Sequence, residues 1–166
     1  REFGIYLHIP FCRSRCDYCG FVSSCDFSRE EEYFSRLCGE IAASEEKGVC
    51  GTLYVGGGTP SAVSPARLAR AVGAVREKFP FSEGGERTVE CNPDSFDRAR
   101  AAAYAEMGFN RVSLGVQSFS DRLLAGVGRR HDAKAALRAA ELALEVFGNA
   151  SVDLMLGLPG QGEREV

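Results

Sequence analysis

The sequence lacks the long apolar runs and blocks of like charge that mark membrane and nucleic-acid proteins. None of its apolar stretches approaches the roughly 18 residues that a membrane-spanning helix requires. In 166 residues the net charge is only −3, and the longest run of one charge is Glu30-Glu31-Glu32. Nothing resembles a secretory signal. We therefore expect a cytoplasmic protein with no membrane span and no nucleic-acid partner.

Two common nucleotide-binding motifs are also missing. A glycine turn, GGGTP at residues 56–60, follows a strand-like run, but it contains no GxGxxG fingerprint, and no Gly-Lys-Ser/Thr follows it. Consecutive glycines let a backbone approach a ligand closely, although such a turn is often only a turn. The sequence therefore offers no sign of a dinucleotide site or a phosphate loop.

Short apolar runs with β-branched or aromatic residues alternate with helical patterns along the chain. The runs lie at residues 4–9, 52–57, 87–92, 111–118 and 151–158. This alternation predicts a parallel sheet, either doubly wound or curled into a barrel. A complete eight-stranded barrel needs roughly 250 residues, so this chain can form only part of one. With no initiator Met and a polar ending, residues 1–166 are interpreted as a single domain, an N-terminal fragment of a longer protein.

Helix ends can be predicted at several places. Ser28 with Glu31 forms a possible capping box. A later helix is expected to start at Asp132 and to stop at Gly148, because glycine readily adopts the left-handed conformation that ends helices. The predicted apolar face of that helix consists of Ala136, Leu137, Ala140 and Leu144.

Three of the seven cysteines, Cys12, Cys16 and Cys19, are clustered directly after the first predicted strand. Thiolates at this CxxxCxxC spacing can converge on one soft metal centre. Structural zinc needs a fourth ligand, for which His8 or Cys25 are weak candidates. A redox pair of the second and third cysteines, or three unligated thiols, are further alternatives.

The other cysteines give weaker signals. We expect Cys38, Cys50 and Cys91 to be packing residues, as lone cysteines usually are. The role of Cys25 stays open.

The cysteine run CRSRCDYC, residues 12–19, resembles the cluster loop of radical S-adenosylmethionine enzymes, in which an aromatic residue such as Tyr18 commonly precedes the third cysteine. The resemblance implies a [4Fe-4S] cluster on Cys12, Cys16 and Cys19, with one iron left open for S-adenosylmethionine. It also implies an electron donor such as flavodoxin or ferredoxin, whose electron would cleave the cosubstrate to a 5′-deoxyadenosyl radical.

Further motifs narrow the resemblance to the oxygen-independent coproporphyrinogen III oxidase-like branch. They occur in the order YLHIPFC, GGGTPS, ECNPDS, GFNRVSLGVQSF, LAGVGRRH and VDLMLGLPGQ. The resemblance implies an α/β fold, a partial (β/α) barrel with about five of six βα units of the radical S-adenosylmethionine core. It also implies cosubstrate contacts, with Gly57, Gly58 and Thr59 at the methionine amino group, Glu90 at the ribose, and Tyr6, Tyr18, Gln117, Arg129 and Asp153 around the site.

The residues themselves support some of these roles and leave alternatives. A carboxylate inside an apolar strand is costly without partners, which applies to Glu90 and Asp153. Alternation places Glu90 on one face with Thr88 and Asn92. A salt bridge from Glu90 to an arginine is an equal alternative, and Arg129 could be an ordinary surface residue.

Within the branch, one position separates two groups. Coproporphyrinogen III dehydrogenases continue the cluster loop with a further cysteine two residues after the third, where this chain has Phe21. We therefore expect the group that resembles heme chaperones, with heme or a porphyrinogen as partner, and the dehydrogenase as the alternative. A zinc-stabilised interaction module without catalysis is the hypothesis from another class. Histidine occurs only at His8 and His131, so we expect any heme site to lie outside these residues.

Overall fold

The computed structural model describes residues 1–165, which contain one sheet of five parallel strands in the order β1-β2-β3-β4-β5. The predicted alternation of strands and helices is confirmed. Because each strand pairs with the next one in the chain, the sheet grows in one direction. The strands are β1 (Glu2–Ile9), β2 (Val49–Gly57), β3 (Arg87–Cys91), β4 (Arg111–Gln117) and β5 (Ala150–Leu154).

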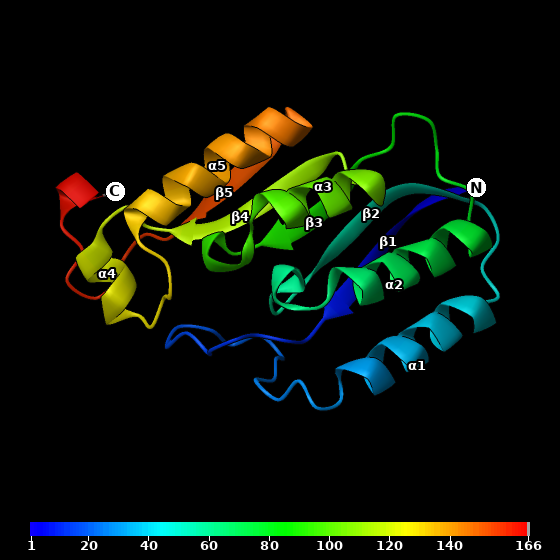
Figure 1. Cartoon of the computed structure of the whole chain (residues 1–166), viewed down its shortest axis with the longest axis horizontal. Coiled ribbons are helices and arrows are strands. Elements are labelled where there is room, and N and C mark those ends of the chain that lie inside the picture. The colour runs from blue at the N-terminus through cyan, green and yellow to red at the C-terminus, as the bar shows by residue number, and fades with distance from the viewer. Residues whose placement is uncertain (166) are drawn as a thin grey trace.

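Four longer helices, α1, α2, α3 and α5, lie side by side along one face of this sheet (Figure 1). Within residues 1–165 no helix is long and apolar enough to cross a membrane. The α-helices are α1 (Glu30–Ala43), α2 (Pro65–Lys78), α3 (Arg98–Glu106), α4 (Asp121–Gly126) and α5 (Ala133–Phe147), and the 3₁₀ turns are η1 (Pro60–Ala62), η2 (Pro93–Ser95) and η3 (Glu163–Glu165).

The two faces of the sheet differ in chemistry, as the strand alternation requires. Leu53, Val55, Leu114 and Val116, predicted as sheet core, are almost completely buried against the helices. Burying each of these side chains is worth about 1.5–3 kcal/mol. The opposite face carries polar side chains or glycine, so the functional groups of the strands are free to face a ligand. Residues of this kind on that face include Tyr54, Gly56, Glu90, Ser113, Gly115 and Asp153.

The predicted capping box at Ser28 and Glu31 is wrong. Helix α1 begins at Glu30, after Arg29, and no side chain caps its first turn. The Glu31 carboxylate instead forms ion pairs with Arg67 and Arg70 of α2, at 2.8 Å each. The ion pairs with α2 therefore take the Glu31 side chain away from the predicted cap, and a local motif cannot reveal such a competition.

Helix α5 begins after Asp132 and ends at Gly148, which adopts the left-handed conformation, so both predicted ends are confirmed. Its predicted apolar face is partly wrong, because Leu137 and Leu144 are more than half exposed. Small side chains face the sheet instead and let the helix approach it closely. The buried residues of α5 are Ala136, Ala139 and Ala143.

The end of the chain also departs from expectation. Strand β5 stops at Leu154, short of the predicted residue 158. Leu158 packs instead on Leu123 and Val127. Leu123 belongs to α4, a helix of six residues that was not predicted because so short a segment shows no clear period.

Candidate functional site: a cleft at the carboxyl ends of the strands

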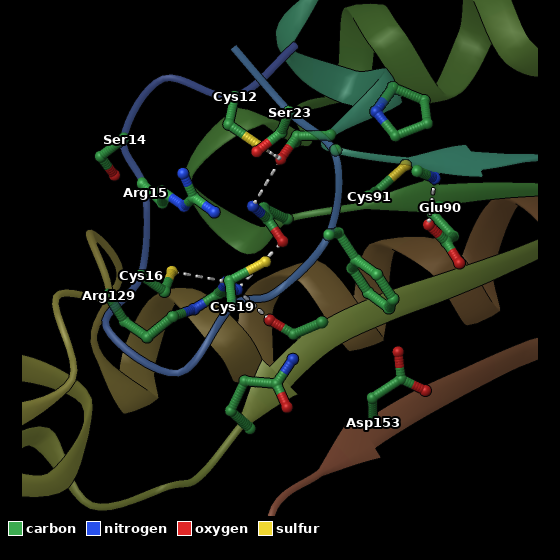
Figure 2. A pocket seen from close by; sticks show the side chains of 18 of the residues that line it. Cys12, Ser14, Arg15, Cys16, Cys19, Ser23, Glu90, Cys91, Arg129 and Asp153 are labelled. Atoms are coloured by element: carbon green, nitrogen blue, oxygen red, sulfur yellow. Dashed lines mark hydrogen bonds between the residues drawn. The ribbon is translucent and has the colours of Figure 1, made fainter. Parts of the chain in front are cut away.

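A cleft opens where the strands of the sheet end, and the cysteine loop forms one of its walls (Figure 2). In open parallel sheets this edge is where ligands bind. The structure brings together every predicted site residue except Tyr6. The cleft is lined by Cys12, Cys16, Tyr18, Cys19, Gly57, Gly58, Thr59, Glu90, Gln117, Arg129 and Asp153, and also by Ser14, Arg15, Phe21, Ser23, Pro60, Cys91, Asn92, Ser113 and Gly115.

The cysteine loop is closed by its own backbone and is tied to the end of β2 by the Cys12 side chain. The Cys12 amide donates to the carbonyl of Ser24 at 3.0 Å, and its buried sulfur lies 3.4 Å from Thr59 Oγ1. Burial raises the pKa of the Cys12 thiol, and the Thr59 hydrogen bond opposes that rise. Cys16 and Cys19 are only partly buried, so three sulfurs of different exposure face one cleft.

The glycine turn after β2 makes room for this loop. A Cβ atom added to Gly58 would lie 3.0 Å from Cys12 Sγ and 2.8 Å from the carbonyl oxygen of Phe11. The three thiols on this cleft fit an iron–sulfur cluster, because thiolates are its usual ligands. Within residues 1–165, no three His, Cys, Asp or Glu side chains are gathered for a single metal ion. A four-iron cluster would bind each cysteine at a different iron, so its thiolates would lie farther apart than the ligands of a single ion.

Glu90 is held by the neighbouring strand β2 rather than by an arginine. Tyr54 Oη donates to its Oε1 at 2.7 Å, and the Gly57 amide donates to its Oε2 at 3.1 Å. Burial, together with the hydrogen bond to this carboxylate, raises the pKa of Tyr54. The alternative of a salt bridge to an arginine is not realised in the part of the chain that the structure describes. The carboxylate therefore stands fixed in the cleft wall as an acceptor.

Gln117 ends β4 with an unusual backbone. Its φ is 69°, and within residues 1–165 no other residue except glycine has a positive φ. The register between β4 and β5 shifts between Gly115 and Gln117, which is the mark of a bulge. Strained residues of this kind gather at functional sites, where the surrounding structure holds them. The strain supports a functional role for Gln117 that its residue type alone did not.

Arg129 reaches across the cleft from the segment after α4. It donates to Asn92 Oδ1 at 3.0 Å, to the Gly115 carbonyl, and to Cys16 Sγ at 3.6 Å. Its Nε is buried without a partner among the described residues. Arg129 also lies beside Tyr18, whose pKa burial raises to about 12 although Arg129 opposes that rise. The alternative of an ordinary surface residue is therefore wrong.

Asn92 is the residue that the sequence reasoning missed. Strand alternation placed it on the same face as Glu90, but it received no role. Its side chain donates to Thr59 Oγ1 at 3.1 Å and accepts from Arg129. The signal that could have found it is its position, directly after the last residue of β3.

Two predicted residues lie differently from the others. Asp153 lines the cleft but is exposed on the edge strand β5, so the argument that it is a costly buried charge is wrong. Tyr6 is 56% exposed, stacks on Tyr54, and shares a hydrogen bond of 3.1 Å with His8 Nδ1. It does not line the cleft, and its contact with a cosubstrate stays a prediction.

His131 should make the stability of the metal-free protein sensitive to mild acid. It is buried, its Nε2 lies 3.1 Å from the Val116 carbonyl, and its pKa is lowered by burial and then by Arg129. A lowered folded-state pKa means stability that is present above the unfolded value of about 6.5 and lost as pH falls below it. The loss from this one proton cannot exceed about 1.4 kcal/mol per pH unit.

The check is urea unfolding of the protein and of His131→Gln at pH 7.5 and 5.5. The glutamine variant keeps a neutral donor for Val116 but cannot take up the proton. We expect it to lose less stability than the parent between the two values. An equal loss in both proteins would mean that His131 does not contribute.

Comparison with known proteins identifies the family. The model of the radical SAM superfamily matches residues 6–166. A heme chaperone HemW of Synechocystis is 40% identical over 94% of this chain and 40% of its own length. HemW of Escherichia coli is 35% identical over 97% of this chain and 44% of its own length. The solved coproporphyrinogen III oxidase HemN of Escherichia coli, a radical SAM enzyme, superposes with a TM-score of 0.91 at 30% identity, covering 99% of this chain and 39% of that one.

The chain belongs to the radical SAM superfamily. Within it, the chain lies in the HemN-like branch, close to HemW. The predicted fold class is thereby confirmed, with the five-stranded parallel sheet as part of the radical SAM barrel. The chain spans less than half the length of the relatives described here.

Proposed function

We propose that this chain is the core of a radical SAM protein in which Cys12, Cys16 and Cys19 hold a [4Fe-4S] cluster and the cleft binds S-adenosylmethionine. When bound, the cluster would supply the electron that cleaves the cosubstrate. The observation that carries the proposal is the convergence of the three thiols, the glycine turn and Glu90 on one cleft at the strand ends. Membership of the superfamily agrees with it.

The chemistry of the cleft suits the different ends of S-adenosylmethionine. Glu90 is a fixed acceptor for ribose hydroxyls, once they compete with Tyr54 and the Gly57 amide. Arg129 is a cation for a carboxylate, and Asp153 is exposed on β5 at the same cleft for positive or hydroxyl groups. Gln117 adds an amide at the strained end of β4. Each residue thus binds and orients the cosubstrate, and none is required to move a proton.

We further propose that the whole protein is heme-chaperone-like rather than a coproporphyrinogen III dehydrogenase. The relatives named HemW and the presence of Phe21 in the cysteine loop support this choice. Both histidines of the chain are engaged, His8 with Tyr6 and the Val22 carbonyl, and His131 in the interior. We therefore expect heme to bind through residues outside this chain. The proposal includes a cytoplasmic location and an electron donor such as flavodoxin or ferredoxin.

The test is anaerobic reconstitution of the chain with iron and sulfide. We expect about four irons and four sulfides per chain, by the stoichiometry of the proposed cluster, with absorbance that fades in air and an electron paramagnetic resonance spectrum that S-adenosylmethionine alters. Stoichiometric zinc that resists air would instead favour the interaction module. For the full-length protein, conversion of coproporphyrinogen III to protoporphyrinogen IX with release of carbon dioxide would show the dehydrogenase, and heme binding without that conversion would support the chaperone.

A further inference from the structure

A continuous chain of hydrogen bonds joins two of the cluster-loop cysteines through the strand ends. It runs from Cys12 Sγ to Thr59 Oγ1 at 3.4 Å, from Thr59 to Asn92 Nδ2 at 3.1 Å, from Asn92 Oδ1 to Arg129 at 3.0 Å, and from Arg129 to Cys16 Sγ at 3.6 Å. Figure 2 labels Cys12 and Cys16, at the two ends of this hydrogen-bond chain, and Arg129 beside Cys16. Asn92 is the midpoint, and without it the two halves would not be connected.

The direction of every bond in this chain follows from Arg129. A guanidinium can only donate, so the atom of Asn92 that faces it must be the oxygen. The amide nitrogen of Asn92 therefore faces Thr59 and donates to its hydroxyl oxygen. The Thr59 proton is then free to point at Cys12 Sγ. Both ends of the chain consequently finish as donors to sulfur.

We propose that Asn92 is a positioning residue that fixes this direction, so that Thr59 and Arg129 both donate to the sulfurs of Cys12 and Cys16. The inference rests on the proposed function, because a cysteine bound to iron is held as a thiolate, whose sulfur is a stronger acceptor than that of a neutral thiol. Hydrogen bonds to the sulfurs of a cluster tune its reduction potential. Such hydrogen bonds stabilise the reduced cluster, which carries more negative charge. The hydrogen-bond chain therefore raises the reduction potential of the cluster and makes the electron transfer that the proposed chemistry requires more favourable.

Three variants separate this role from simple packing. Thr59→Val removes the donor to Cys12 with little change in shape. Asn92→Asp keeps the acceptor for Arg129 but also accepts from Thr59, which turns the Thr59 proton away from Cys12. Ser113→Ala is the control, because it also lines the cleft but takes no part in the chain.

The measurement is a redox titration of the reconstituted proteins followed by electron paramagnetic resonance. Losing one hydrogen bond to a charged group should lower the constant for one-electron reduction about tenfold, or about 59 mV, in Thr59→Val. We expect at least the same lowering of this constant in Asn92→Asp. In Ser113→Ala the constant should change less than threefold. In the double variant Thr59→Val/Asn92→Asp, the potential should fall by about 59 mV less than the sum of the two single shifts. The reason is that both single variants remove the same donor to Cys12. Additive shifts would overturn the proposal.

A second measurement needs no metal. The Asp17 amide donates to the carbonyl of Val127, two residues before Arg129, and so reports on how Arg129 holds the cysteine loop. In metal-free protein we expect Asn92→Leu, which removes one acceptor of Arg129 and leaves the Gly115 carbonyl, to raise hydrogen exchange at Asp17 about fivefold. Asn92→Asp should leave it unchanged. If the wild-type chain binds no cluster, the proposed function fails while this test still decides the positioning role, and unchanged exchange in Asn92→Leu would overturn it.

Discussion

Replacing Cys12, Cys16 and Cys19 together with alanine is expected to abolish iron and sulfide binding while the fold remains. The thiols line the cleft wall, and only Cys12 is buried. Because each proposed iron–cysteine bond comes from this loop, the reconstituted variant should contain less than about a tenth of the wild-type iron, which corresponds to a loss of more than about 1.4 kcal/mol in binding. Iron analysis, visible absorbance and far-ultraviolet circular dichroism of the same sample are the measurements.

The matched control replaces three other cysteines, Cys25, Cys38 and Cys50, with alanine. Cys38 and Cys50 pack against the hydrophobic core, whereas Cys25 is exposed near the end of the cysteine loop. We expect this variant to keep its iron, with some loss of stability at Cys50. If it lost iron while its far-ultraviolet circular dichroism stayed that of the parent, Cys25 would be a fourth ligand, and the open iron that the proposed function requires would not exist. Retention of iron in the first variant would refute the predicted ligand set directly.

The strands and helices could be predicted because their signals are local. Alternation along β4 predicted that Leu114 and Val116 would be core, and their burial confirms it. The ends of α5 were predictable because they depend on nearby residues: the Asp132 side chain accepts from the Ala135 amide, and Gly148 adopts the left-handed conformation. The capping-box prediction failed because its outcome depends on a distant segment, as Glu31 forms ion pairs with Arg67 and Arg70 of another helix. Competition over a long sequence distance leaves no mark in a local pattern.

The residues of the site could be predicted from the sequence, but the hydrogen bonds that join them could not. Motif resemblance named Thr59 and Arg129, and both line the cleft. The link between them is Asn92, whose role depends on three segments meeting in space. The strain at Gln117 was equally hidden, because a positive φ at glutamine is disfavoured by the residue itself and arises from the bulge beside β5. Both features are properties of the assembled sheet.

The glycine turn has a structural role that the sequence did not indicate, and its contact with a cosubstrate stays a prediction. Consecutive glycines were interpreted as room for a ligand. In the structure, Gly58 gives that room to the chain itself, because the carbonyls of Ile9 and Phe11 and the sulfur of Cys12 occupy the space that a side chain would need. The amides of Gly58 and Thr59 donate to those same carbonyls at 2.8 Å each. The turn is therefore the backbone clamp that holds the start of the cysteine loop.

Gly58→Ala should consequently damage both the fold and the cluster site. The new Cβ would lie 2.8 Å from Phe11 O and 3.0 Å from Cys12 Sγ, and neither can retreat without breaking the clamp. We expect a loss of about 1–3 kcal/mol in the free energy of unfolding, as for overpacking in a core. The same strain on Cys12 should lower iron incorporation about fivefold or more.

Gly73→Ala is the control for this substitution, because Gly73 lies inside α2 and an added Cβ would meet nothing within 4 Å. A glycine in a helix interior costs about 0.5–1 kcal/mol relative to alanine, so this variant should be more stable than the parent and bind the same iron. Urea unfolding of the metal-free proteins and iron analysis after reconstitution measure the two effects separately. Normal iron content in Gly58→Ala would show that the loop can shift, and that the close approach of the glycine turn to Cys12 is not needed to place that ligand.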